Sequence, residues 1–197
     1  SIEKPVIYKA LVIGVSAGGL KALCEVIPQL PANFPISVVV VQHRKHSVGD
    51  YLVEYLSERC QLEVQSALPH RLIAPGVVYI APSGYHLLVE RNATFSLSID
   101  ARVNYSIPSI DVLFESAAIC YQEHLIGLIL TGANHDGSLG LKTIHKYHGL
   151  TLVQDPDSAE YPAMPQAAIE VTKVDHILPL SEIAEFLTNL VMSKCDG

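Results

Sequence analysis

The stretch YKALVIGVSAGG, residues 8–19, decides the fold because it joins a nearly continuous apolar run to a loop rich in glycine. Parallel strands that are covered on both faces have such runs, so we expect a buried strand over Tyr8–Gly14. The stretches SVVVVQ, residues 37–42, and LIGLILT, residues 125–131, have the same character. The sequence therefore predicts a parallel sheet whose central strands are buried on both faces.

Further strands and helices alternate with these runs. The remaining strand candidates are shorter and lie at Val77–Ala81, Leu150–Gln154 and His176–Leu178. Amphipathic stretches predict helices at Leu20–Ile27, Val48–Arg59, Ser109–Tyr121, Ser138–Tyr147 and Ser181–Met192. Ser109 and Ser181 are the expected N-cap residues of their helices.

The segment from His86 to Ile99 departs from this rhythm. It alternates apolar and polar residues on both sides of a turn at residues 91–93, which predicts an antiparallel hairpin. The repeated strand–helix–strand units predict an α/β fold with a doubly wound, mostly parallel sheet, helices on both faces and a small antiparallel hairpin. No linker or repeat is visible, so we expect a single domain over residues 1–197.

Composition excludes several classes of protein. The chain is 49% hydrophobic, and its 13 Lys+Arg against 20 Asp+Glu give a net charge of −7, which argues against nucleic acid as a partner. No apolar run reaches the ~18–20 residues of a membrane span, and no signal peptide is visible. We therefore expect a cytoplasmic protein, with reduced thiols at Cys24, Cys60, Cys120 and Cys195.

Chemistry is expected at the carboxyl ends of the strands, where ligands bind in open sheets of this kind. Ser16 follows the first strand within Gly14-Val15-Ser16-Ala17-Gly18, which matches the G-x-S-x-G pattern of a nucleophile elbow. His43 follows the second strand, and Asp136 follows the strand at residues 125–131. A serine needs a nearby base, and a histidine base needs an anion that fixes its tautomer, so these three residues predict a catalytic triad.

Each of the three residues has a simpler alternative role. The glycine loop around Ser16 is also compatible with a phosphate-binding loop or a tight turn, and His43 with a solvated loop residue. Asp136 is also placed to cap the helix at Ser138–Tyr147. The chain order of serine, histidine and aspartate differs from that of α/β-hydrolases, but a triad is defined by geometry rather than by order.

With these positions in hand, the sequence closely resembles the catalytic domain of CheB-type chemotaxis protein-glutamate methylesterases. The resemblance covers nearly the whole chain and rests on ordered blocks at residues 12–19, 41–43, 80–88, 108–118, 130–132, 136–137, 154–156 and 164–165. The triad of that family corresponds to Ser16, His43 and Asp136.

The resemblance implies a serine hydrolase that removes methyl groups from glutamyl methyl esters of chemotaxis receptors, releases methanol and also deamidates receptor glutamines. It implies no metal or organic cofactor. Backbone N–H groups of Ala17 and of the Gly132–Ala133 segment are the expected donors to the oxyanion. Within the matching blocks, we expect His86 to have a packing or hydrogen-bonding role, and Asp111 to stabilise the start of its own helix.

The chain departs from the family pattern near the triad. Ala17 replaces a hydroxyl residue, while Ala133 and Asn134 replace a methionine–glycine pair, and Asn134 is costly if its φ is positive. Members of the family often carry an N-terminal receiver domain, which we do not expect in this sequence. These departures leave open a non-catalytic module that binds the receptor without turnover. A third alternative is a metal site using His43 with His46 or His135 with Asp136, although no third ligand has recognisable spacing. His135 is also a rival of His43 as the base.

Overall fold

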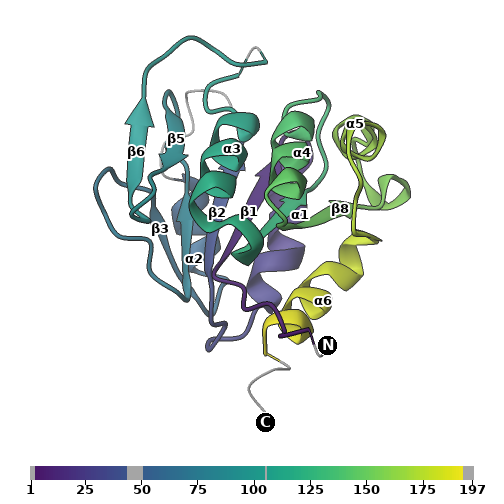
Figure 1. Ribbon diagram of the computed structural model, residues 1–197, viewed down its shortest axis with the longest axis horizontal. Coiled ribbons are helices and arrows are strands. Elements are labelled where there is room, and N and C mark those ends of the chain that lie inside the picture. Colours follow the sequence, from purple (N-terminus) through teal and green to yellow (C-terminus); the bar gives the residue numbers. More distant parts are fainter. Residues whose placement is uncertain (1–2, 44–50, 105, 193–197) are drawn as a thin grey trace.

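The computed structural model describes residues 3–43, 51–104 and 106–192, and these form a parallel sheet with helices on both of its faces. The seven strands lie in the order β3-β4-β2-β1-β7-β8-β9, and every pairing among them is parallel. A separate antiparallel pair, β5-β6, forms the hairpin. The predicted fold class is confirmed (Figure 1).

The strands lie close to their expected positions. Their bounds are β1 Ala10–Val15, β2 Ser37–Gln42, β3 Glu63–Ser66, β4 Val77–Ile80, β5 His86–Val89, β6 Phe95–Ser98, β7 Leu125–Ile129, β8 Leu150–Gln154 and β9 His176–Leu178. Strand β3 was not predicted, because it is a short edge strand in which Val64 is the one buried residue. A polar edge strand has no apolar run that would reveal it.

The helices are α1 Gly19–Val26, α2 Tyr51–Ser57, α3 Ile110–Tyr121, α4 Ser138–Lys146, α5 Ala163–Val171 and α6 Leu180–Met192, with short 3₁₀ turns at Ile27–Gln29, Gln122–His124 and Pro156–Ser158. The prediction missed α5, whose third residue is Pro165. Proline fits in the first helical turn, where its missing N–H would have no intrahelical partner. The first residues of the expected helix at Val48–Arg59 lie outside the described part of the chain.

One expected helix start was wrong. Helix α6 begins at Leu180, so Ser181 lies inside the helix and does not cap it. The Leu180 N–H instead donates to the hydroxyl of Ser158, a residue that is distant in sequence. A donor at the first helical turn can be satisfied by tertiary structure as well as by a local side chain.

Alternate side chains of each central strand pack on opposite faces of the sheet. Leu11 and Ile13 of β1 belong to the core beneath α1, α2 and α6, whereas Ala10 and Val12 belong to the core beneath α3, α4 and α5. Figure 1 shows α3 and α4 in front of the sheet and α1 behind it. This double cover explains why β1 is apolar at every position.

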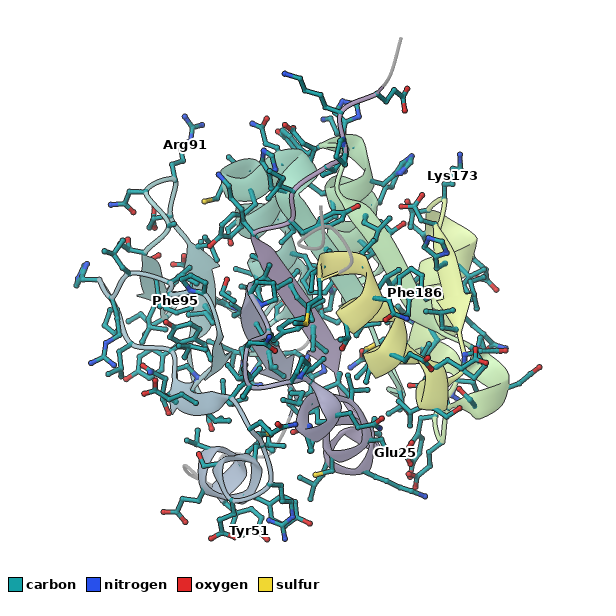
Figure 2. All side chains as sticks on the ribbon, turned by 90° about the horizontal axis from the view of Figure 1, so that it is seen from below. Glu25, Tyr51, Arg91, Phe95, Lys173 and Phe186 are labelled. Atoms are coloured by element: carbon teal, nitrogen blue, oxygen red, sulfur yellow. The ribbon has the colours of Figure 1, made fainter. Side chains whose placement is uncertain are left out.

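The hairpin packs on the second of these cores through its aromatic residue. Phe95 is fully buried, and its ring meets the Tyr79 ring edge-on at a centroid distance of 5.0 Å. In Figure 2, Arg91 at the hairpin turn points away from the molecule, whereas Phe95 lies inside it. Burial of one side of the hairpin anchors the chain that leads into α3.

Candidate active site

The carboxyl ends of β1, β2 and β7 carry the predicted site residues. Strand β1 lies between β2 and β7, and its loop leads to α1 on one face while that of β7 leads to α4 on the other. The connections therefore diverge between β1 and β7, which is the switch point at which open sheets bind ligands.

Main-chain hydrogen bonds extend the sheet by one residue into the site. The Ser16 N–H donates to the Thr131 carbonyl at 3.0 Å, and the His43 N–H donates to the Val15 carbonyl at 3.0 Å. Because Val15 pairs with Gln42 in the parallel register, the next step along both strands brings Ser16 opposite His43. The backbone thus sets serine and histidine side by side.

Ser16 lies in an open part of the site. Together with His43 it lines a pocket of about 450 Å³, whose wall also includes Ala17, Gly18 and Gln42. Gly18 has a φ of 77°, which favours glycine, and a Cβ at this position would lie 3.0 Å from a carboxylate oxygen of Glu160. Within the described chain, the Ser16 hydroxyl has no hydrogen-bond partner.

His43 and Asp136 are joined directly. His43 Nε2 lies 2.6 Å from Asp136 Oδ2, and the exposed fraction of the two side chains is 11% and 0%. Burial raises the pKa of the Asp136 carboxyl, but the hydrogen bonds from His43, the Ile110 N–H and Asn104 outweigh it, so this pKa lies below its usual value. An ionised carboxylate can only accept hydrogen bonds, so Nε2 carries the proton and donates a hydrogen bond to Asp136.

Asp136 receives further hydrogen bonds from the start of α3. The Ile110 N–H donates to Oδ2 at 2.6 Å, while the Asp111 N–H and the Ser109 hydroxyl donate to Oδ1 at 3.1 and 2.9 Å. Ser109 is the N-cap residue, as expected, but its hydroxyl makes no capping bond to its own helix. The carboxylate of Asp136 takes that role and is held by the positive end of the helix.

Asp111 performs the reciprocal task for α4. Its Oδ1 accepts the N–H groups of Gly137 and Gly140 at 3.0 and 2.7 Å, so it stabilises the neighbouring helix in addition to lying in the first turn of its own. The alternative role of Asp136 as N-cap of α4 is wrong, because Gly137 occupies that position with a φ of 101°. Asp136 thus accepts N–H groups at the start of α3, and Asp111 of α3 accepts N–H groups at the start of α4.

Asn104 links these two carboxylates. Its Nδ2 donates to Asp111 Oδ2 at 2.7 Å and to Asp136 Oδ1 at 2.9 Å. Burial raises the pKa of Asp111, the Gly140 N–H lowers it, and the charge of Asp136 raises it again, with a net rise above the usual value. Sequence reasoning missed Asn104, since it lies in an irregular segment that carries no motif.

His86 supports the same segment from the hairpin. The Ser109 N–H donates to His86 Nδ1 at 3.1 Å, so the proton of the neutral ring is on Nε2, which donates to the Ala101 carbonyl at 3.0 Å. The side chain is buried, and both of these hydrogen bonds join it to residues outside the predicted triad. The hydrogen-bonding role that we expected for His86 is therefore confirmed.

The expected oxyanion donors differ in availability. The Gly132 N–H is already used, because it donates to the Tyr161 carbonyl at 3.0 Å, and Gly132 itself is buried. Ala133 is exposed, and Ala17 lines the pocket with Ser16. Among the described residues, the N–H groups of Ala17 and Ala133 have no protein acceptor.

The loop of Ala133 and Asn134 contains an unpredicted contact. Asn134 Nδ2 lies 3.1 Å from His43 Nδ1, and Asn134 Oδ1 accepts the Asp136 N–H at 3.1 Å. The described non-glycine residues with positive φ do not include Asn134, so its replacement of glycine causes no backbone strain. His135 is exposed, and among the described residues its side chain makes no hydrogen bond to Ser16 or Asp136.

The described residues offer no group of three or more metal-ligating side chains that could hold an ion. His46, one of the histidines of the metal alternative, lies outside the described residues. In the part of the chain that the structure covers, we find no helix with the length and apolarity needed to cross a bilayer. Cys24, Cys60 and Cys120 are free thiols, and Cys195 is not described.

Comparison with known proteins gives a consistent result. A family model described as CheB methylesterase matches residues 11–187. A protein of Leptospira interrogans is 50% identical over 184 residues, covering 93% of this chain and 95% of the relative, and its name provisionally assigns it as a protein-glutamate methylesterase/protein-glutamine glutaminase.

A relative from Carboxydothermus hydrogenoformans, named protein-glutamate methylesterase/protein-glutamine glutaminase 1, is 38% identical over 180 residues. The match covers 89% of this chain but 53% of that relative, so the chain spans about half of the longer protein. The crystal structure of the Thermotoga maritima CheB methylesterase catalytic domain matches with a TM-score of 0.89 and 35% identity, covering 94% of this chain and all of that chain.

Proposed function

The chain belongs to the CheB methylesterase family, and on that premise we propose that it hydrolyses glutamyl methyl esters of methyl-accepting chemotaxis receptors, with Ser16, His43 and Asp136 as its triad. The observation that carries the proposal is the 2.6 Å bond between His43 and a fully buried, ionised Asp136. This bond leaves the other ring nitrogen, Nδ1, as the base at the wall of the pocket that contains Ser16.

The first half of the reaction forms an acyl-enzyme. The Ser16 oxygen attacks the ester carbonyl carbon while its proton moves to His43 Nδ1, and the Ala17 N–H donates to the oxyanion. When the intermediate collapses, the bond to the methoxy group breaks and His43 returns the proton, so methanol leaves. Asp136 stabilises the imidazolium that exists between these two transfers.

The second half regenerates the enzyme. Water loses a proton to His43 Nδ1 and attacks the acyl carbon, and the bond to the Ser16 oxygen then breaks as that proton returns to Ser16. The product is a receptor glutamate. A glutamine substrate follows the same steps with ammonia as the leaving group, which matches the second activity in the names of the relatives.

The direct test measures methanol release from methylated receptor by the wild-type protein and by Ser16→Ala. We expect release that depends on the wild-type protein and falls to background in the variant. Equal turnover by the two proteins would exclude Ser16 as the nucleophile. Receptor binding without methanol release, and without labelling of Ser16 by a fluorophosphonate, would favour the non-catalytic alternative.

A further inference from the structure

The basic nitrogen of His43 is already occupied in this structure. The proton on Nε2 faces Asp136, so Nδ1 has one lone pair with which to accept a hydrogen bond. Asn134 Nδ2 lies 3.1 Å from that nitrogen. The side-chain amide of Asn134 therefore donates a hydrogen bond to the same lone pair that must receive the proton of Ser16 under the proposed function.

The orientation of the Asn134 amide follows from its second bond. The Asp136 N–H can only donate, and it lies 3.1 Å from Asn134 Oδ1. The oxygen must face Asp136, so the NH₂ group must face His43. The backbone and the carboxylate of Asp136 thus act on opposite sides of one ring: the carboxylate binds Nε2, and the N–H aims the amide at Nδ1.

Under the proposed function, Ser16 must donate to the nitrogen that Asn134 contacts. The Ser16 hydroxyl has no hydrogen bond to any described residue, although Ser16 and His43 line the same pocket. We propose that Asn134 is a positioning residue that restrains His43 in the resting enzyme, and that its amide must leave Nδ1 before Ser16 can transfer its proton. This proposal rests on the proposed function of the triad.

The restraint has a predictable sign. Asp136 alone is sufficient to fix the tautomer of the ring, so loss of the Asn134 amide leaves Nδ1 basic and removes its competitor. A neutral hydrogen bond of this kind has a modest net strength, so its removal should accelerate acylation of Ser16 about 2- to 10-fold. An aspartate at position 134 acts oppositely, because a carboxylate beside Nδ1 favours its protonation and so removes the base.

The experiment measures the rate of covalent labelling of Ser16 by a fluorophosphonate. Asn134→Ala and Asn134→Gly should each raise the limiting rate about 2- to 10-fold without changing the half-saturating probe concentration, since Asn134 acts through His43. Asn134→Asp should lower the rate. His135→Ala is the matched control, because His135 is the exposed neighbour on the same loop, and its labelling rate should equal that of the wild type.

Nitrogen NMR of the imidazole supplies a readout that a purely structural role would not change. In the wild type, Nε2 should be protonated and Nδ1 should show the shift of a hydrogen-bonded acceptor. In Asn134→Ala, the proton should remain on Nε2 while the Nδ1 signal moves. A wild-type ring that is protonated on Nδ1 would overturn the proposal.

The proposal and the proposed function fail in different ways. An unchanged or lower labelling rate in both Asn134→Ala and Asn134→Gly, with melting temperatures close to that of the wild type, overturns the restraint and leaves the triad intact. Labelling of the wild type that is no faster than labelling of Ser16→Ala instead contradicts the triad. Thermal melting identifies any variant that has lost its fold.

Discussion

The two ends of the triad differ in how completely the fold holds them. The Asp136 side chain is fully buried and accepts five hydrogen bonds, from His43, Asn104, Ser109, Ile110 and Asp111. Ser16 is half-buried at the wall of a pocket of about 450 Å³, and its hydroxyl contacts no described hydrogen-bond partner. The fold thus supplies hydrogen-bond donors to the carboxylate of Asp136, whereas no described residue supplies a partner to the hydroxyl of Ser16.

This difference indicates where the free energy of folding is used in the site. Burying a carboxylate is costly unless hydrogen bonds from the protein replace those from water. Ser109 and the first two residues of α3 supply such bonds to Asp136. The fold thus prepares the electrostatics of the base before substrate arrives. The serine hydroxyl needs no such support, because it is neutral and reaches water through the pocket.

The largest effect on stability is expected from Asp136→Asn. The amide replaces one acceptor oxygen by a donor and faces several N–H groups, so we expect a loss of about 3 kcal/mol in the free energy of unfolding. Activity should fall about 10⁴-fold, because His43 loses the anion that fixes its tautomer. Urea denaturation and methanol release measure the two effects. A stable variant with altered activity alone would show that the buried end is not structural.

Asn104→Ala should have an intermediate effect. The substitution removes the amide that donates to both Asp111 and Asp136, so each of these buried carboxylates loses one hydrogen bond. We therefore expect a loss of about 1–2 kcal/mol in the free energy of unfolding. Activity should fall about 10-fold as Asp136 loses one constraint. Asn92→Ala at the exposed hairpin turn is a suitable control, and equal stability of the two variants would contradict the role of Asn104.

Acid should weaken the buried end in a predictable direction. The folded-state pKa of Asp136 lies below its usual value, so its stabilisation is present above about pH 4 and is lost as pH falls through the lowered pKa. Asp111 has a raised pKa, so its protonation in acid has the opposite effect and partly offsets this loss.

The check is a pH series of urea unfolding for the wild type and Asp136→Asn. The difference in unfolding free energy between them should shrink as pH falls below about 4. A difference that stays constant or grows in acid would show that Asp136 is not held as an anion.

The smallest effect on stability is expected from Ser16→Ala. The variant should lose turnover, yet its unfolding free energy should change by less than about 0.5 kcal/mol, since no described hydrogen bond of the hydroxyl is lost. Differential scanning calorimetry of this variant beside Asp136→Asn makes the comparison directly. A large loss in Ser16→Ala would show that the nucleophilic end is also built into the fold.

Much of the fold could be read from apolar periodicity. The central strands and the hairpin were predicted closely, since strands buried on both faces leave apolar runs that need no context. Strand β3 and helix α5 were missed for a common reason. The edge strand Glu63–Ser66 has a single buried residue, and the helix Ala163–Val171 has a proline in its first turn, so neither shows a clear apolar period in the sequence.

Interpretation of the site was less complete. The positions of Ser16, His43 and Asp136 at the strand ends followed from topology, because parallel strands present their carboxyl ends at one edge. The exchange of caps between Asp111 and Asp136 did not follow, since it depends on how closely α3 and α4 approach each other. A Cβ on Gly140 would lie 2.6 Å from Phe114 Cβ, which shows how tight that packing is.

The amino-acid sequence by itself determined most of the strands and helices and the three loops that carry hydroxyl, imidazole and carboxylate, because backbone preference and apolar spacing are local properties. Only the tertiary structure decided which ring nitrogen of His43 faces Asp136, and that Asn134 meets the other. Those choices depend on hydrogen bonds between residues that lie 93 and 91 positions apart in the chain. Folding alone brings such donors and acceptors within about 3 Å of each other.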